Sequence, residues 1–192
     1  MSEASDTELL RRTTAGDADA FTALYRRRQA AVYRFALQMS GSEELAEDVV
    51  QEVFLALIRD ARGYNPQRGS VASFLYGMAR NHVLRRLDRR WLARDEAEEP
   101  AAGDHPESEL ARGELISSVR AAVLALPVHY REVVVLCDLE ETDYAEAAAA
   151  LGCAVGTVRS RLHRARQMLA QRLHAFGDAH VRRGIRPARC SI

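Results

Sequence analysis

One acidic segment divides this chain into two helical halves and so limits the folds that it can adopt. Residues 95–109 (DEAEEPAAGDHPESE) hold seven acids, two prolines, one glycine and no large apolar residue, so we expect them to stay solvated. On either side, apolar residues recur at helical spacing, and no strand-like alternation of useful length is found. The pattern predicts an all-α protein, built as two small helical domains joined by a flexible acidic linker.

Helix-start residues refine this prediction. Ser42 and Asp143 are residue types favoured at helix N-caps, and Glu146, three residues after Asp143, suggests a capping box. The turn GYNPQRGS at 63–70 separates two helices of the first half, because its proline and glycines interrupt helical spacing. The expected helices cover about 17–39, 42–62, 71–90, 110–125, 128–138, 143–150 and 155–175.

Charge is unevenly distributed, although the formal net charge is zero. Residues 77–94 contain six arginines against one acid, and residues 147–192 contain nine arginines against one acid. Because charges act over a Debye length of about 8–10 Å, local blocks matter more than the total. Two basic blocks separated by an acidic one predict contacts with nucleic acid.

Several classes of protein find no support in the sequence. No stretch approaches the roughly 18–20 apolar residues of a membrane span, and the acidic N-terminus lacks the layout of a signal peptide, so we expect a cytoplasmic location. No phosphate loop, His-Glu-x-x-His motif or nucleophile–base arrangement is present, so we expect no enzyme and no cofactor. Cys137, Cys153 and Cys190 form no C-x-x-C pair, and we expect no metal site or disulfide framework, with Cys137 and Cys153 as small core residues.

Residues 144–169 have the layout of a helix-turn-helix: a short Ala-rich helix, a turn at Gly152 and a second helix. An Arg-rich surface helix is the alternative, but the short preceding helix and the turn favour DNA. On the second helix, an apolar stripe should pack inward, formed by Val155, Val158, Leu162, Ala165 and Leu169. The opposite face carries side chains that can hydrogen-bond base edges, namely Thr157, Ser160, His163, Arg164 and Gln167, with Arg159, Arg161 and Arg166 on the flanks near phosphates.

The N-terminal half contains two further candidate surfaces. On the helix at 46–59, one face is apolar, whereas the other presents Leu55 among acids and an amide, which fits a partner's basic helix or an ordinary solvated face equally well. The segment 64–90 combines a polar turn with Phe74, Tyr76 and arginines, which suits single-stranded DNA because unpaired bases stack on aromatic rings. Both aromatic residues are equally compatible with a packed core.

Together, these sequence segments resemble those of the extracytoplasmic-function (ECF) RNA polymerase sigma factors of the sigma-70 superfamily. LPVHYREVVVLCDLEETDYAEAAAALGCAVGTVRSRLHRAR at 126–166 looks like region 4 of that family, which recognises the −35 promoter element. One departure is Glu141-Thr142-Asp143, where the family usually has Gly-Leu-Ser. The resemblance implies base contacts by Ser160, His163 and Arg164, and contacts near the DNA backbone by Tyr144, Thr157, Arg159, Arg161 and Arg166.

AEDVVQEVFLALIR at 46–59 is similar to region 2.2, and the stretch at 64–90 is similar to regions 2.3 and 2.4. The first implies docking on a coiled coil of the largest polymerase subunit, through Asp48, Gln51, Glu52 and Phe54. The second implies a pocket for a flipped base of the −10 element, through Asn65, Gln67, Arg68, Ser70, Phe74, Tyr76, Arg80 and Asn81.

The resemblance implies a sigma factor that binds core RNA polymerase, recognises promoter DNA as duplex and as single-stranded non-template strand, assists melting, and is held by an anti-sigma factor. The alternative is a helix-turn-helix regulator that acts on duplex DNA without docking on polymerase. The expected divisions are region 2 at 1–94, the acidic linker at 95–109, region 4 at 110–176 and a basic tail at 177–192.

Overall fold

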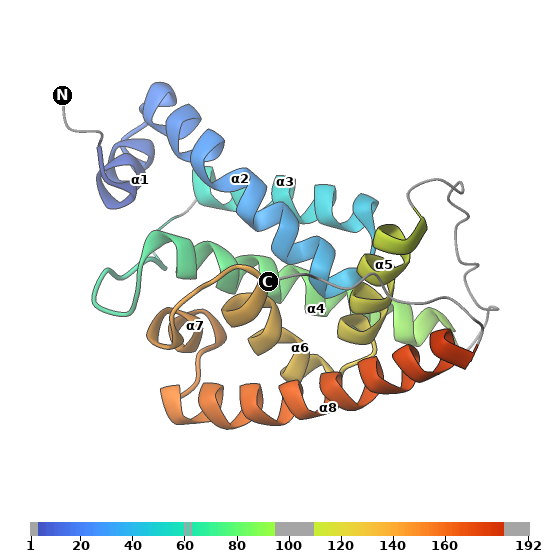
Figure 1. Ribbon diagram of the computed structural model, residues 1–192. Coiled ribbons are helices and arrows are strands. Elements are labelled where there is room, and N and C mark those ends of the chain that lie inside the picture. Colours follow the sequence, from blue (N-terminus) through green and yellow to red (C-terminus); the bar gives the residue numbers. More distant parts are fainter. Residues whose placement is uncertain (1–3, 60, 62, 95–109, 183–192) are drawn as a thin grey trace.

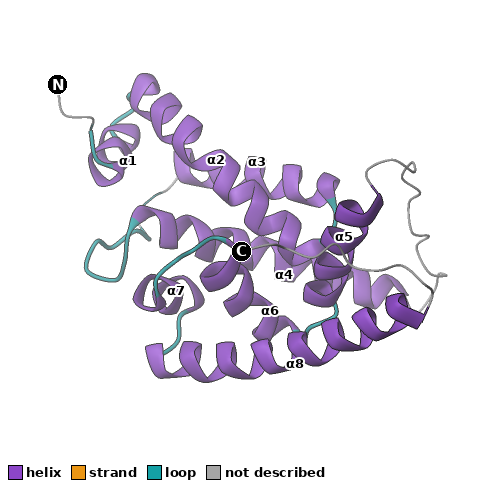
Figure 2. Cartoon of the chain, viewed as in Figure 1, coloured by secondary structure: helices purple, strands orange, loops and turns teal. Residues whose placement is uncertain are grey.

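The computed structural model describes residues 4–59, 61, 63–94 and 110–182, and its elements are all helical, as expected. Figures 1 and 2 show the helices packed into one body. The elements are α1 (Asp6–Thr14), α2 (Ala18–Ser40), α3 (Glu43–Arg59), α4 (Val71–Arg94), α5 (Leu110–Leu124), α6 (Val128–Val134), the π-helical turn η1 (Val135–Leu139), α7 (Tyr144–Leu151) and α8 (Val155–Arg182). None of these helices is both long enough and apolar enough to cross a membrane.

Helices α1–α4, here called the N-terminal module, form a bundle in which α2 packs on α1, α3 and α4. A two-residue connection reverses the chain between α2 and α3. Gly41 ends α2 in the left-handed conformation at φ 69°, which costs glycine little. The side chain of Ser42 then accepts a hydrogen bond from the amide of Leu45 at 3.3 Å, which confirms the N-cap predicted there.

Helix α1 was not among the expected elements. Its N-cap is Ser5, whose hydroxyl accepts from the amide of Glu8 at 3.3 Å, and the helix buries Leu9 and Leu10 against the bundle. Asp6 pairs with Arg27 at 2.7 Å and also with Arg28, both on α2. Nine residues are too few for a clear apolar period, so its stability depends on these tertiary contacts.

Helices α5–α8, together with η1, are here called the C-terminal module. Asp143 caps α7 by accepting from the amides of Ala145 and Glu146, each at 2.9 Å, as predicted. Gly152 ends α7 at φ 64°, and α8 follows and packs on α5, α6 and α7. Helix α8 continues to Arg182, so the first residues of the segment expected as a tail extend this helix.

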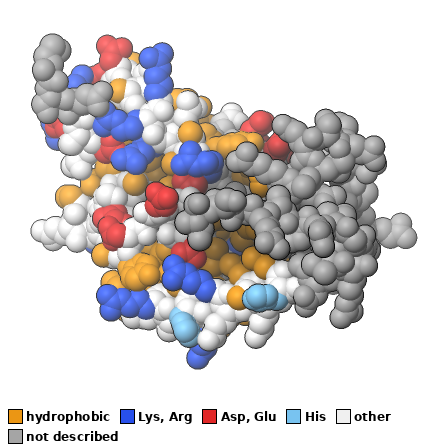
Figure 3. Space-filling view, in the orientation of Figure 1, with side chains coloured by type: hydrophobic (Ala, Val, Ile, Leu, Met, Phe, Trp, Pro, Cys, Tyr) orange, Lys and Arg blue, Asp and Glu red, His pale blue; other side chains and the backbone are white. Residues whose placement is uncertain are grey.

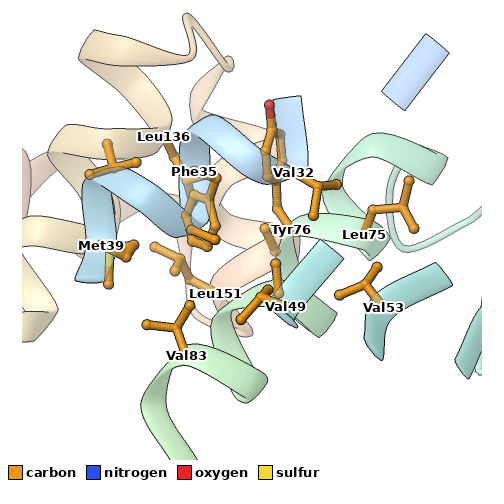
Figure 4. Packing of buried hydrophobic residues seen from close by; sticks show 14 of the residues in the cluster. Val32, Phe35, Met39, Val49, Val53, Leu75, Tyr76, Val83, Leu136 and Leu151 are labelled. Carbon is orange, nitrogen blue, oxygen red and sulfur yellow. The ribbon is translucent and has the colours of Figure 1, made fainter. Parts of the chain in front are cut away.

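The two modules share one hydrophobic cluster. Leu136 and Leu151 of the C-terminal module belong to the same cluster as Phe35, Tyr76 and Val83 of the N-terminal module (Figure 4). Helix α7 lies along α4, and a Cβ on Gly77 would come within 3.1 Å of the carbonyl oxygen of Ala150. The acidic segment expected as a linker, 95–109, lies outside the described residues.

Candidate nucleic-acid interface

Helix α8 divides into a buried face and an exposed face. Val158, Leu162 and Ala165 are at most 2% exposed, whereas Val155 and Leu169 at the ends of the predicted stripe are half-buried. The side chains expected to contact bases (Ser160, His163 and Arg164) are exposed, as is Gln167. Arginine and histidine side chains follow the lower edge of the molecule, where α8 runs (Figure 3).

The other predicted −35 residues surround this exposed face. The guanidinium of Arg159 lies 5.9 Å from the ring centre of Tyr144, a cation–π distance that joins the two helices of the motif. Arg166 forms a two-point contact with Asp138 of η1, at 3.1 and 2.5 Å, and this contact raises the pKa of Arg166 further above its ordinary value. Because of this contact, Asp138 partly neutralises Arg166, one of the three flanking arginines. Thr157 and Arg161 are half-buried.

The turn between α3 and α4 lines a pocket of about 210 Å³ together with α4 and one residue of α7. This is below the roughly 300–1,000 Å³ of drug-sized sites, so the pocket has room for a small group only. The side chain of Asn65 accepts from the amide of Gln67 at 2.9 Å and so shapes the turn. Five of the predicted −10 residues line the pocket: Asn65, Arg68, Ser70, Phe74 and Asn81.

Several residues of this pocket were missed by sequence analysis. The ring of Tyr64 packs on Phe74 with centres 5.6 Å apart, so Phe74 both packs and faces the pocket. Buried Ser73 and half-buried Met78 also line it. So does Ala149, which comes from α7 of the other module and could not be assigned to the pocket from local sequence.

Tyr76 and Arg80 lie outside the pocket lining. Tyr76 is 7% exposed, its ring lies 5.4 Å from that of Phe35, and its hydroxyl donates to Glu140 at 3.2 Å. Burial and the nearby Glu140 carboxylate raise the pKa of Tyr76 to about 12. The Nε of Arg80 donates to Glu132 at 2.6 Å. The structure favours the core alternative for Tyr76, because α7 packs on α4 and the ring of Phe35 from α2 packs against Tyr76.

Helix α3 presents most of the predicted docking face. Gln51 and Glu52 are exposed, and Asp48 is half-exposed with a 3.1 Å ion pair to Arg86. Phe54, the fourth residue expected to dock on polymerase, is 2% exposed and so lies mostly beneath this face. Its ring packs edge-on against Tyr25, with centres 4.8 Å apart, because α2 covers that side of α3.

An apolar groove runs beside this face, between α2 and α3. Its volume is about 680 Å³, and sequence analysis did not identify it. Leu55 and Ile58, which are 38% and 52% exposed, form one wall, and Tyr25 and Tyr33 contribute from α2. Exposed apolar side chains beside Glu47 and Gln51 give α3 a mixed surface of the kind that protein partners bind.

The cysteine side chains that the structure places are partly buried. Burial, and then the neighbouring Asp138, raise the pKa of the Cys137 thiol to about 11, which fits a small packed residue more than a reactive one. Cys153 is half-buried, and Cys190 falls in the part of the chain that is not described. Among the side chains that are placed, no group of three His, Cys, Asp or Glu residues is arranged to hold a metal ion.

Two family models match the chain, one in each module. The model described as Sigma-70 region 2 matches residues 24–93, and the model described as Sigma-70, region 4 matches residues 116–169. The ECF RNA polymerase sigma factor SigM of Mycobacterium tuberculosis is 36% identical over 89% of this chain and 86% of its own length. The ECF RNA polymerase sigma factor SigE of Mycolicibacterium smegmatis is 39% identical over 72% of this chain, and the match spans 55% of that relative.

Two solved structures resemble the fold. CnrH in complex with the cytosolic domain of CnrY superposes with a TM-score of 0.68 and 29% identity, over 88% of this chain and 97% of that one. The sigma factor RpoE of Bartonella quintana, in complex with the anti-sigma factor NepR, gives a TM-score of 0.57 and 26% identity, over 76% of this chain and 91% of that one. The chain therefore belongs to the extracytoplasmic-function RNA polymerase sigma factors of the sigma-70 family.

Proposed function

We propose that this protein binds core RNA polymerase and directs promoter-specific transcription initiation by recognising −35 and −10 elements and assisting DNA melting. One observation carries the proposal above all: α8 buries its apolar stripe and presents Ser160, His163 and Arg164 to solvent. Side chains of these types on a helix-turn-helix can hydrogen-bond base edges in a major groove. Tyr144, Thr157, Arg159, Arg161 and Arg166 would then contact or approach the phosphates.

The N-terminal module supplies the melting function. Holding a promoter open requires a base to leave the stack, which costs a few kcal/mol and calls for a pocket to receive it. The 210 Å³ pocket beside Asn65, Arg68 and Ser70 has the size and the polar donors for that role, with Phe74 and Tyr64 as its aromatic wall. Gln67, exposed on the same turn, would contact the backbone or a neighbouring base.

Polymerase docking is assigned to the exposed face of α3. Asp48, Gln51 and Glu52 supply acceptors for a basic helix, while Leu55 and Ile58 add apolar contact. The proposed divisions are region 2 at 1–94, a linker at 95–109, region 4 at 110–176 and a C-terminal segment at 177–192. An anti-sigma partner is proposed as well, because the related RpoE was crystallised with one.

The alternative, a duplex-binding regulator without polymerase docking, leaves the N-terminal half unexplained. That half matches Sigma-70 region 2 over residues 24–93. Sigma factors are in general regulators rather than enzymes, and we propose no catalytic residue here. The protein would use binding free energy from its DNA and polymerase contacts to favour strand separation.

Run-off transcription tests the proposal. Core polymerase with and without the purified protein is incubated with a genomic promoter library, and the 5′ ends of the transcripts are mapped. We expect a set of start sites that appears only with the protein and shares −35 and −10 sequences. The proposal is wrong if the protein changes no start site on any template.

A further inference from the structure

An ion pair joins the π-helical turn η1 to the recognition helix α8 at the edge of the C-terminal module. The Nε and Nη2 groups of Arg166 donate to the two carboxylate oxygens of Asp138, at 3.1 and 2.5 Å. The side chain of Asp138 is 27% exposed and that of Arg166 is 56% exposed. Because a two-point contact fits the planar guanidinium in one way only, Asp138 fixes the orientation of Arg166 as well as pairing with its charge.

Asp138 occupies only one side of the Arg166 guanidinium. The carboxylate binds Nε and Nη2, so the Nη1 amino group stays available to another acceptor. Tyr144, the first residue of α7, lies beside the same guanidinium: Asp138 contributes most to the raised pKa of Arg166, and a hydrogen bond with Tyr144 adds to it. The ring of Tyr144 also has the guanidinium of Arg159 at 5.9 Å. Three residues assigned to the DNA backbone are thus linked to one another and to Asp138.

The backbone that places Asp138 is unusual in two ways. Val135–Leu139 form a π-helical turn, in which the amide of Glu140 donates to the carbonyl oxygen of Val135 at 2.9 Å. Such turns are rare and occur often at functional sites. Glu141 then adopts the left-handed conformation at φ 52°, which is uncommon for a residue other than glycine. Asp138 and Tyr144, which lie on either side of this bend, therefore reach the same arginine.

By charge alone, Asp138 should oppose DNA binding. At about 7–8 Å from a phosphate in water, one negative charge weakens binding by roughly twofold, and salt reduces the effect further. An unrestrained arginine, however, loses side-chain freedom when it binds a phosphate, which lowers the affinity by a factor of about 2–12. An arginine that a carboxylate already holds avoids most of that loss. The gain from ordering Arg166 therefore exceeds the loss from the added charge.

We propose that Asp138 is a positioning residue for −35 recognition, which holds Arg166 beside Tyr144 in the orientation that meets a DNA phosphate. The inference rests on the proposed function, because Tyr144, Arg159 and Arg166 are assigned there to the DNA backbone. It deepens that function by naming a residue that acts on DNA only through another side chain.

The test uses the full chain bound to core polymerase. Filter retention at fixed salt measures the affinity of the holoenzyme for a duplex promoter that carries the −35 sequence from the mapped start sites. D138A removes the contact with Arg166, whereas D138E keeps a carboxylate that can still reach it. E141Q is the matched control for charge, because Glu141 is an exposed acid three residues away. R166A and the double variant D138A/R166A complete a double-mutant cycle.

We expect D138A to weaken promoter binding by about three- to tenfold, although it removes a negative charge beside DNA. D138E should stay within about twofold of the wild type, and E141Q should bind equally well or up to about twofold more tightly. In the R166A background, D138A should change the affinity by less than about twofold, because no arginine is left to position. Urea denaturation checks that each variant is folded. If D138A is not folded, D138N, which keeps the side-chain volume, replaces it in every comparison.

Tighter binding by D138A would overturn the proposal, since Asp138 would then act only as an opposing charge. Equal weakening by D138A with and without Arg166 would overturn it as well, because Asp138 would then support the fold. If R166A left the affinity unchanged, the phosphate contact of Arg166 would be wrong and the role of Asp138 would be refuted with it. Failure of the whole proposed function would look different: the wild-type protein would not alter promoter retention by core polymerase.

Discussion

Replacing Arg164 by alanine tests the −35 assignment most directly. Arg164 is exposed on α8, one turn after Ser160 and beside His163. The apolar stripe that holds α8 in place lies on the other side of the helix, at Leu162 and Ala165. The substitution should therefore leave the free energy of unfolding within about 0.5 kcal/mol of the wild type.

The expected loss follows from the kind of contact. An arginine that bonds one base edge with two hydrogen bonds contributes about 1–3 kcal/mol of discrimination. At 1.4 kcal/mol per factor of ten, Arg164→Ala should weaken binding to the preferred −35 element by roughly 5- to 150-fold. The loss should disappear on templates where that base pair is already changed, since no contact is then left to remove.

The assay is holoenzyme binding to a set of promoters, each with one −35 base pair substituted, measured by filter retention at fixed salt. Arg161→Ala is the comparison, because Arg161 lies on the flank of α8 and is assigned to phosphate. Arg161→Ala should weaken binding equally across the set of promoters. It should also reduce the slope of log affinity against log salt concentration by about one. If Arg164→Ala also weakened every promoter equally, the base contact would be refuted and Arg164 would be a phosphate contact.

Four further outcomes are expected. Leu162→Ala should lower the free energy of unfolding by about 2–5 kcal/mol in urea denaturation, because this 2% exposed side chain fills the core beneath the recognition helix. The fold favours the neutral phenol of Tyr76, whose pKa is raised from 10 to about 12, so that stabilisation is complete below pH 10 and is lost as the pH rises through 12. Tyr76→Phe should lack this decline when unfolding is measured at pH 8, 10.5 and 11.5. Asp143→Ala should cost about 1 kcal/mol by removing the α7 cap, whereas Asp143→Asn should cost little. Leu55→Glu should weaken core polymerase binding roughly tenfold, whereas Leu139→Glu, on a residue of similar exposure in the C-terminal module, should not; equal effects in an anisotropy titration would contradict the α3 docking face.

Local features were predictable because their causes lie within a few residues. Ser42 and Asp143 each accept a hydrogen bond from an amide two or three positions along, and both predicted caps are confirmed. The buried face of α8 follows from apolar residues spaced alternately three and four positions apart. The polar residues between them are exposed because they lie on the opposite side of the helix. Helix α1 escaped prediction because its support comes from Arg27 and Arg28 on the next helix.

Long-range features could not be predicted from spacing. Glu132 and Arg80 are 52 positions apart, and nothing in either neighbourhood pairs them. Phe54 illustrates the same limit on one helix: the apolar stripe of α3 explains Val50 and Val53, but α2 covers an adjacent side as well, so Phe54 is buried there too. Glu146 fits a capping box by sequence, yet its carboxylate accepts from Ser70 of the other module.

The two proposed surfaces of the N-terminal module differ in accessibility, and this difference implies an order of events. Gln51 and Glu52 on α3 are exposed, and the groove beside them is lined by α2 and α3 alone, so polymerase could dock without any movement of the C-terminal module. The −10 pocket, in contrast, is lined in part by Ala149 of that module. Opening it would also expose Leu136 and Leu151, which is unfavourable in water. Polymerase contacts that form first could offset that cost. The free protein would then have little affinity for single-stranded DNA until it has bound core polymerase.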